Sequence, residues 1–270
     1  MVIQLVSYKS SLRNDSKLRH TTNIINSSTA NLILFSGHTL SSHYDIYELN
    51  SHVKNTKTTA VMEVKENAIS ELNPIHNSLY LLQNGIAKDM FTHQLFKDSA
   101  SISTSPELGE HLILDLETRR KFSINNRNIA VIQCGENNIL RNIQSEDNKT
   151  VFRFENNPKL HQRFSEFLDS TNIILNPIHS PMGNQGKMRK RREYFSNNNR
   201  AYFSTANFDD ENSINNKSIQ YACINGKELE PSKIEIDKRN SYIMALYIIL
   251  CKCRIRDSEM SLVFSLLLNL

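Results

Sequence analysis

The feature that most constrains this chain of 270 residues is an alternation of short apolar runs with amphipathic segments that begin at good helix caps. Strands are expected near residues 1–7, 31–35, 58–64, 78–83, 112–116, 129–133, 173–175, 201–205 and 218–224. Helices are expected at about 16–28, 43–54, 157–168 and 187–196. This alternation predicts an α/β fold in which two sheets pack face to face and helices cover the outer faces.

The composition is that of a folded protein rather than of a membrane or nucleic-acid binding chain. Hydrophobic residues make up 39% of the sequence and charged residues 22%, and the formal net charge is only +4. The longest apolar stretches near the end, Tyr242–Cys251 and Leu262–Leu268, are too short to span a bilayer. The four cysteines include no pair with metal-ligand spacing, so no metal or other cofactor is expected. Few cysteines and no signal peptide favour a location in the cytoplasm.

The chain divides by composition into residues 1–238, expected to form one domain, and an apolar segment at 239–270 that lacks turn residues. This segment is interpreted as a C-terminal extension that packs on the core or on a second subunit. The alternative is a disordered or foreign tail. An exposed run such as Leu262–Leu268 would be a liability on a monomer, so a homo-oligomer is expected.

The sharpest chemical signal is the segment Asn128–Asn138, with the sequence NIAVIQCGENN. An apolar strand leads directly into Cys134, then Gly135, then polar residues that can begin a helix. A cysteine at a strand exit is held exposed, and the N–H groups of the next turn can stabilise an oxyanion and the thiolate. The alternative is that Cys134 is a small buried core residue.

This segment resembles the nucleophile strand and elbow of the nitrilase, or carbon–nitrogen hydrolase, superfamily. Other segments resemble the family's strands and loops in the same order, namely Asn31–Leu40, Asn77–Gly85, Met90–Phe96, Ile173–Pro177, Arg200–Asn207 and Cys223–Leu229. The resemblance covers about residues 1–230. It implies a four-layer αββα sandwich in which a cysteine attacks an amide or nitrile carbon, a glutamate transfers protons and a lysine stabilises negative charge. It also implies a small amide-like ligand or substrate and a homo-oligomer.

The sequence departs from the family pattern at two of these three catalytic positions. The family's glutamate stands two residues after the phenylalanine of its second strand, and here Phe35 is followed by Ser36 and Gly37. The lysine position aligns with Thr92, and Lys88 or Lys97 would need a shifted loop to reach the site. A thiol without its base is a weak nucleophile, so we expect a degenerate carbon–nitrogen hydrolase with little or no amidase activity.

The alternative is an active amidohydrolase that cleaves a non-peptide C–N bond through Cys134 with a replacement acid or base. Three residues are candidates for that role: His38, Glu136 and Glu110. His38 follows the lost base position and has a suitable pKa, whereas Glu136 lies two residues after Cys134. Glu110, like Glu107, precedes the nucleophile strand, where the family often has a further glutamate. The structural interpretations are a polar loop residue for His38 and a helix cap or arginine partner for Glu136.

Two further polar features of the sequence are a basic run and a histidine near the end of an expected strand. The run Lys187–Arg192 holds five basic residues in six positions, which is interpreted as a solvated helix face. Nucleic acid is therefore an unlikely partner. His179 follows Asn176-Pro177 on a strand that borders the pocket in the family, and it is interpreted as a loop histidine rather than a ligand.

Overall fold

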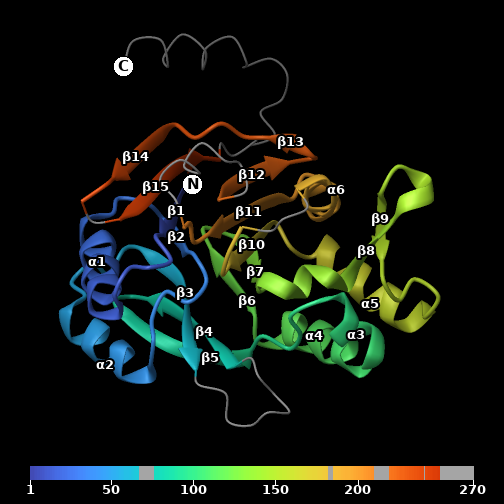
Figure 1. Cartoon of the computed structure of the whole chain (residues 1–270), viewed down its shortest axis with the longest axis horizontal. Helices are drawn as coiled ribbons and strands as arrows, with labels where there is room; N and C mark the ends of the chain where they lie inside the picture. The colour runs from blue at the N-terminus through green and yellow to red at the C-terminus, as the bar shows by residue number, and fades with distance from the viewer. Residues whose placement is uncertain (67–75, 182–184, 210–218, 240, 250–270) are drawn as a thin grey trace.

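The computed structural model describes residues 1–66, 76–181, 185–209, 219–239 and 241–249, and within them two β-sheets lie face to face between two layers of helices (Figure 1). The first sheet has the order β14-β15-β1-β2-β3-β4-β5. Its strands are β1 (Val2–Tyr8), β2 (Leu32–Phe35), β3 (Thr59–Glu66), β4 (His76–Gln83), β5 (Ile86–His93), β14 (Lys233–Asp237) and β15 (Tyr242–Ile248). In its centre, β1, β2 and β3 run parallel.

The second sheet has the order β13-β12-β11-β10-β7-β6. Its strands are β6 (Lys121–Ile124), β7 (Arg127–Val131), β10 (Ile173–Ile178), β11 (Ala201–Ala206), β12 (Gln220–Ile224) and β13 (Lys227–Glu228). Here β7, β10 and β11 are parallel neighbours. A separate hairpin of β8 (Leu140–Ile143) and β9 (Lys149–Phe152) extends from the edge of the molecule in Figure 1.

Helices cover both outer faces, as the flanking ribbons in Figure 1 show. On the first sheet lie α1 (Asn14–Ser27) and α2 (His43–His52), whose apolar side chains pack on β2, β3 and β4. On the second lie α4 (Glu107–Thr118), α5 (Pro158–Asp169) and α6 (Gln185–Ser196). The short elements are α3 (Ser99–Thr104) and the 3₁₀ helices η1 (Cys134–Ile139) and η2 (Gln144–Glu146).

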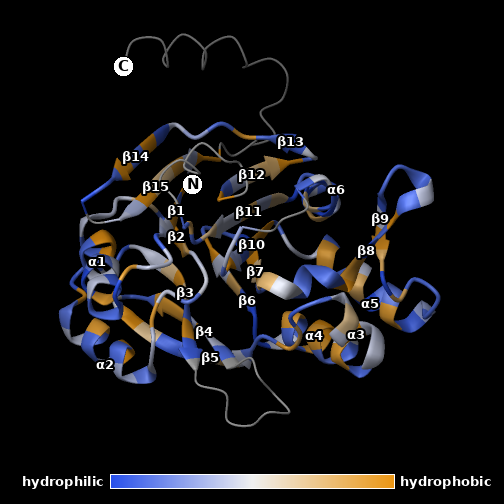
Figure 2. Cartoon of the chain, in the orientation of Figure 1, coloured by the Kyte–Doolittle hydropathy of each residue, from blue (hydrophilic) through white to orange (hydrophobic). Residues whose placement is uncertain are grey.

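The layer between the sheets is a dry core built by alternate residues of the central strands. Leu5, Leu34 and Val61 from the first sheet meet Leu175 and Phe203 from the second, and all five are fully buried. Burial of each such side chain contributes about 1.5–3 kcal/mol relative to exposure. In Figure 2 the hydrophobic colour accordingly follows the strands and the inner sides of the helices. The four-layer αββα arrangement expected from the sequence is confirmed.

One expected strand is wrong. Residues 112–116 lie inside the helix α4, where Leu112, Ile113 and Leu116 are fully buried. An apolar run of five residues fits a strand or one face of a helix equally well, and here the helix starts upstream at Glu107. The strands β5, β6, β14 and β15, the β8–β9 hairpin and α3 were not anticipated.

The domain extends past the boundary expected after residue 238. Strand β15 lies between β14 and β1 and pairs with β1 over its whole length, from Val2–Ile248 to Tyr8–Tyr242. Its inward residues Ala245 and Tyr247 belong to the core between the sheets. The run Leu262–Leu268 lies outside the described residues. Among the described helices, none is both long and apolar enough to cross a membrane.

Candidate active site

Cys134 stands at the carboxyl end of β7, where η1 begins, and its side chain is partly exposed. The next residue, Gly135, is needed because a Cβ there would lie 2.2 Å from the carbonyl oxygen of Lys97. The main chain that follows β5 therefore packs directly against the nucleophile turn. In parallel sheets the carboxyl ends of neighbouring strands meet at one edge, and this is where ligands bind. Cys134 lies at that edge.

His179 follows β10, the parallel neighbour of β7, and it lies between Cys134 and a buried carboxylate. Its Nε2 is 2.7 Å from Oε2 of Glu63, a residue of β3 in the opposite sheet that is completely buried. Cys134 is near enough to the ring to raise the pKa of His179 as well. A buried imidazole–carboxylate pair therefore joins the two sheets beside the thiol, and a cysteine nucleophile with an oriented base needs such a pair.

The electrostatics of this series favour a charged pair. Burial alone lowers the pKa of His179, but the Glu63 carboxylate and Cys134 outweigh it and raise the pKa to about 10. Burial alone raises the pKa of Glu63, but His179 and the amide of Gln133 bring it below its ordinary value. At neutral pH His179 is therefore an imidazolium held by an ionised Glu63.

The amide side chain of Gln133 holds the carboxylate in place. Gln133, the residue before Cys134, donates from its side chain to Oε1 of Glu63 at 2.9 Å and to the carbonyl of Asn77 at 2.8 Å. The Glu63 carboxylate in turn accepts Nε2–H of His179 and orients the ring. The side-chain nitrogen of Asn77 lies 3.1 Å from the same Nε2, but a protonated ring cannot accept a hydrogen bond from it.

Gly37, the position of the missing glutamate, is adjacent to this series. A Cβ on Gly37 would lie 2.2 Å from Cδ2 of His179 and 3.0 Å from Oε2 of Glu63. His179 and Glu63 therefore occupy the space into which a side chain at position 37 would project. The next candidate, His38, stacks on the His179 ring with 3.9 Å between centroids and donates its main-chain N–H to Glu63. Burial and His179 lower the pKa of His38 to about 4, so its ring is neutral at pH 7.

Glu136 is committed to a structural contact. Its carboxylate makes a buried ion pair with Arg120 at 2.5 Å and accepts the N–H groups of Gln133 and Leu95. The expected helix cap and arginine partner are both present, and the arginine is Arg120.

The other sequence-derived positions also have partners of their own. Thr92 is buried, donates to Asp115 at 2.5 Å and accepts Nε of Arg120 at 2.9 Å. Glu110 lies on the half-exposed outer side of α4, 3.5 Å from Arg163. Of the three proposed replacements, the structure brings only His38 into contact with the His179–Glu63 pair.

The basic run Lys187–Arg192 differs from the expected solvated face. Arg189 is exposed and pairs with Glu193, but Arg191 and Arg192 are buried. Arg191 donates to Asn138, while the Arg192 guanidinium lies 4.3 Å from the Tyr221 ring centre. Two of the five basic residues therefore fasten α6 to the rest of the fold, Arg191 to η1 and Arg192 to β12 of the second sheet.

Sequence reasoning missed Glu63 and undervalued His179. The available signal was a single ionisable residue, Glu63, within the apolar strand run 59–64, because a charge in a buried strand requires a partner. That the partner is His179, 116 residues away, follows only from the packing of the two sheets.

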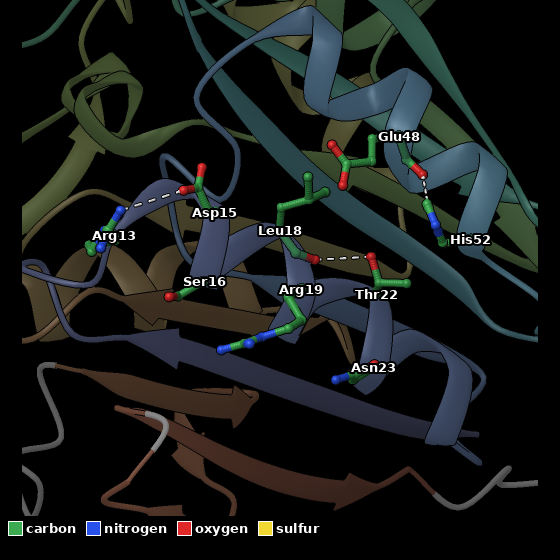
Figure 3. A pocket seen from close by; sticks show the side chains of 9 residues that line it. All are labelled: Arg13, Asp15, Ser16, Leu18, Arg19, Thr22, Asn23, Glu48 and His52. Carbon is green, nitrogen blue, oxygen red and sulfur yellow. Dashed lines mark hydrogen bonds and ion pairs between the residues drawn. The ribbon is translucent and has the colours of Figure 1, made fainter.

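The donor atoms of His38, Glu63 and His179 lie within 4.8 Å of one another, so one metal ion of the type that accepts nitrogen and oxygen ligands could contact all three. Two of these atoms, Nε2 of His179 and Oε2 of Glu63, already form a hydrogen bond with each other. A cavity of about 510 Å³ lies between α1 and α2, away from these residues in its lining (Figure 3). The side chains drawn there bond mainly within their own helices, such as Thr22 to the Leu18 carbonyl, and no cysteine lines it.

Comparisons with known proteins give a fold but no sequence relative. No family model matches the chain, and no curated protein matches it. An amidase from Nesterenkonia sp. matches in structure with a TM-score of 0.53 and 10% identity, covering 98% of this chain and 96% of the amidase. A variant of the Nesterenkonia sp. AN1 amidase matches with a TM-score of 0.55 and 9% identity, covering 98% and 97% of the two chains. It shows covalent addition of the acetamide moiety of fluoroacetamide at its active site cysteine.

A further variant, in complex with butyramide, matches with a TM-score of 0.53 and 8% identity and covers 92% of this chain and 90% of its own. That amidase is described as belonging to the nitrilase superfamily. This chain therefore has the αββα fold of the nitrilase-type amidases.

Proposed function

We propose that this protein hydrolyses the C–N bond of small amides, with Cys134 as nucleophile, His179 as proton donor and acceptor, and Glu63 as the residue that positions His179. The observation that carries the proposal is the bond between His179 and the buried Glu63 carboxylate, beside a cysteine that raises the pKa of the same ring. The structurally similar amidases bind acetamide-type and butyramide ligands, which supports a small amide as substrate.

The expectation of a degenerate protein rested on the absence of a base beside the thiol. His179 and Glu63 supply one from different strands, and they fill the space next to Gly37. This geometry favours the alternative of an active enzyme with a replacement base. The replacement that it supports is His179, with His38 stacked on it as a neutral neighbour.

The reaction uses the proton on His179. Cys134 adds as its thiolate to the amide carbon, and the C=O electron pair moves to oxygen. When the intermediate collapses, the C–N bond breaks, and the His179 imidazolium gives its proton to the leaving nitrogen, which departs as ammonia. The neutral imidazole then removes a proton from water, whose oxygen attacks the thioester. Collapse of this second intermediate breaks the C–S bond and releases the carboxylic acid, which frees the Cys134 sulfur and leaves the water proton on His179.

The test is ammonia release from acetamide and butyramide by the purified chain and by variants at each position. Cys134→Ala should abolish turnover, and His179→Gln should lower kcat/KM by about 10²–10⁴-fold. His161→Gln is the matched control, because His161 is exposed on α5. It should leave kcat/KM unchanged.

A covalent readout complements the turnover assay. Fluoroacetamide should modify Cys134 and leave Cys223 unmodified, because burial raises the pKa of Cys223 to about 11. Peptide mass spectrometry distinguishes the two sites. His179→Gln should slow modification of Cys134, and a chelator should not, since the imidazole acts here by proton transfer. No turnover of any amide, together with modification of Cys134 that does not depend on His179, would restore the degenerate interpretation.

A further inference from the structure

A second cavity, of about 230 Å³, lies where the carboxyl ends of β1, β2, β3 and β10 meet the first turn of α1. It is smaller than the roughly 300–1,000 Å³ of pockets that hold drug-sized ligands, so its occupant is a small ion or group. Cys134 does not line this cavity, which is therefore considered as a binding site separate from the thiol.

The cavity has a positive charge. Lys17 and Lys65 both line it, and no aspartate or glutamate does. Lys17 is only 7% exposed, and its ammonium donates to the His38 carbonyl at 3.3 Å. Burial and the neighbouring Lys65 both lower the pKa of Lys17, so the two like charges are close enough to repel each other. An anion between them would remove this repulsion and compensate for the burial of the Lys17 charge.

The carboxylates around this cavity are engaged elsewhere. Glu63 bonds His179 on the far side of the ring pair, and Asp45 accepts the N–H and the hydroxyl of Ser41. Asp15, in the first turn of α1, lines the other cavity, between α1 and α2. In the part of the chain that the structure describes, neither cavity lysine forms an ion pair, so the positive charge remains without a counter-charge from the protein.

Neutral hydrogen-bond donors complete the wall. The Ser10 hydroxyl and the Asn14 side-chain amide line the cavity, and among the described residues neither has a hydrogen-bond partner. Asn14 is also the first residue of α1, where main-chain N–H groups have no intrahelical acceptor and the cap residue Arg13 provides no side-chain bond. Two ammonium groups, a hydroxyl and an amide suit an anion with several acceptor oxygens and more than one negative charge.

We infer that this cavity binds a phosphoryl group, as inorganic phosphate or on a small phosphomonoester, between the ammonium groups of Lys17 and Lys65. A phosphoryl group offers three or more acceptor oxygens and close to two negative charges, which match the two ammonium groups better than the single charge of a carboxylate does. The site is independent of the proposed hydrolysis, because it involves neither Cys134 nor any step at the thiol.

The experiment is a calorimetric titration of the full-length chain with inorganic phosphate, glycerol phosphate and acetate at constant ionic strength and about pH 8, where a phosphoryl group is a dianion. At least one of the two phosphoryl ligands should bind about tenfold or more tightly than acetate, and added KCl should weaken the binding. Tighter binding of inorganic phosphate identifies the free ion as the occupant, and tighter binding of glycerol phosphate identifies the ester.

Three lysine variants assign the binding to the cavity. Lys17→Met and Lys65→Met should each weaken phosphoryl binding by about tenfold or more, because each removes a hydrogen bond between charged groups. Lys57→Met is the matched control: Lys57 is exposed and precedes β3, whereas Lys65 lies near its other end. The control should bind as the wild type does. Lys65 is also exposed, so its variant keeps the test decisive if Lys17→Met does not fold.

Imidazole signals in NMR spectra of the full chain locate the ligand directly. His38 lines the cavity, so its ring signals should shift as the phosphoryl ligand is added, whereas those of His161, exposed on α5, should not. Histidine-to-glutamine variants assign the signals. Acetate that binds as tightly as both phosphoryl ligands, binding that survives Lys17→Met and Lys65→Met, or binding that leaves the His38 signals unmoved would each overturn the inference. Absence of any phosphoryl binding would do so as well.

Discussion

At the scale of single residues, a side chain at position 37 and the ring of His179 compete for one volume. A glutamate at 37 would enter the space of His179, so it would displace the residue that we propose as the acid–base group. Glycine at 37 and histidine at 179 are thus complementary in volume, and in the proposed function the acid–base group comes from the end of β10 rather than from the end of β2.

Gly37→Ala tests this complementarity. The added methyl group would meet Cδ2 of His179, so we expect the ring to shift, Cys134 to react more slowly with iodoacetamide at pH 7, and stability to fall by about 1–3 kcal/mol. Gly109→Ala is the matched control, because its Cβ would meet the Phe154 ring at the same 2.2 Å, and the three atoms nearest to that Cβ all belong to Phe154. It should cost similar stability and leave the alkylation rate unchanged. Unchanged alkylation in Gly37→Ala would contradict the proposed role of His179.

The pH dependence of turnover provides a second residue-scale prediction. Because the Glu63 carboxylate raises the pKa of His179 to about 10, the imidazolium can protonate the leaving nitrogen up to that pH, and kcat/KM should fall as pH rises through about 10. In Glu63→Gln the carboxylate charge is lost, so the descending limb should move to lower pH. A pH–rate profile of both proteins checks this, and an identical high-pH limb would refute the coupling.

At the scale of elements, η1 depends on a buried ion pair. Glu136 and Arg120 are both fully buried, and the Glu136 carboxylate also accepts the N–H of Gln133 at the start of the turn that carries Cys134. The residue that the sequence presented as a candidate base therefore shapes the nucleophile turn. For the expected strand at 112–116, the sequence indicated burial correctly but not the type of element, because these apolar residues are core residues of the helix α4.

Glu136→Gln should destabilise the protein by about 3–5 kcal/mol, because it leaves the Arg120 charge buried without its main partner. Denaturant unfolding measures the free energy. Glu146→Gln, which removes the exposed pair with Lys149, is the control and should cost less than about 1 kcal/mol. If Glu136→Gln also lowers the free energy of unfolding by less than about 1 kcal/mol, the expectation is wrong, and Asp115, 3.6 Å from Arg120, compensates for the lost partner.

At the scale of the whole molecule, the first sheet is complete only when the late strand β15 pairs with β1, the first strand of the chain. Strand β15 pairs with β1 from Tyr8–Tyr242 to Val2–Ile248, so residues more than 230 positions apart lie side by side. Tyr247 contributes to the core between the sheets, and its ring meets Phe203 of the second sheet edge to face at 5.7 Å. The residues just beyond 238 are thus part of the fold.

Tyr247→Ala should lower the free energy of unfolding by about 3–5 kcal/mol, as expected for removal of a buried aromatic side chain. Its neighbour Ile248 points away from the core and is 56% exposed, so Ile248→Ala should cost less than about 1 kcal/mol. Thermal and denaturant unfolding compare the two. Equal costs would mean that β15 is not the inner strand described here.

Self-association remains a prediction, based on the apolar composition of Leu262–Leu268. Light scattering on the full chain should give a mass above that of one 31.1 kDa chain. A clean monomer would contradict it.

The sequence by itself determined the elements whose signals are local: the helix α5 that Asn157 caps, the Asn84-Gly85 turn with both residues at positive φ, and the strand β7 that leads to Cys134. It also determined the layer order, since alternating apolar runs and amphipathic helices pack in few ways. Only the tertiary structure decided the partner of Cys134. Glu63 and His179 lie on different sheets, and no periodicity or spacing in the chain shows that β3 faces β10. Contacts across a sandwich are set by the packing of whole layers. The strand that carries a nucleophile can therefore be predicted from the sequence, whereas a partner residue on the opposite sheet cannot.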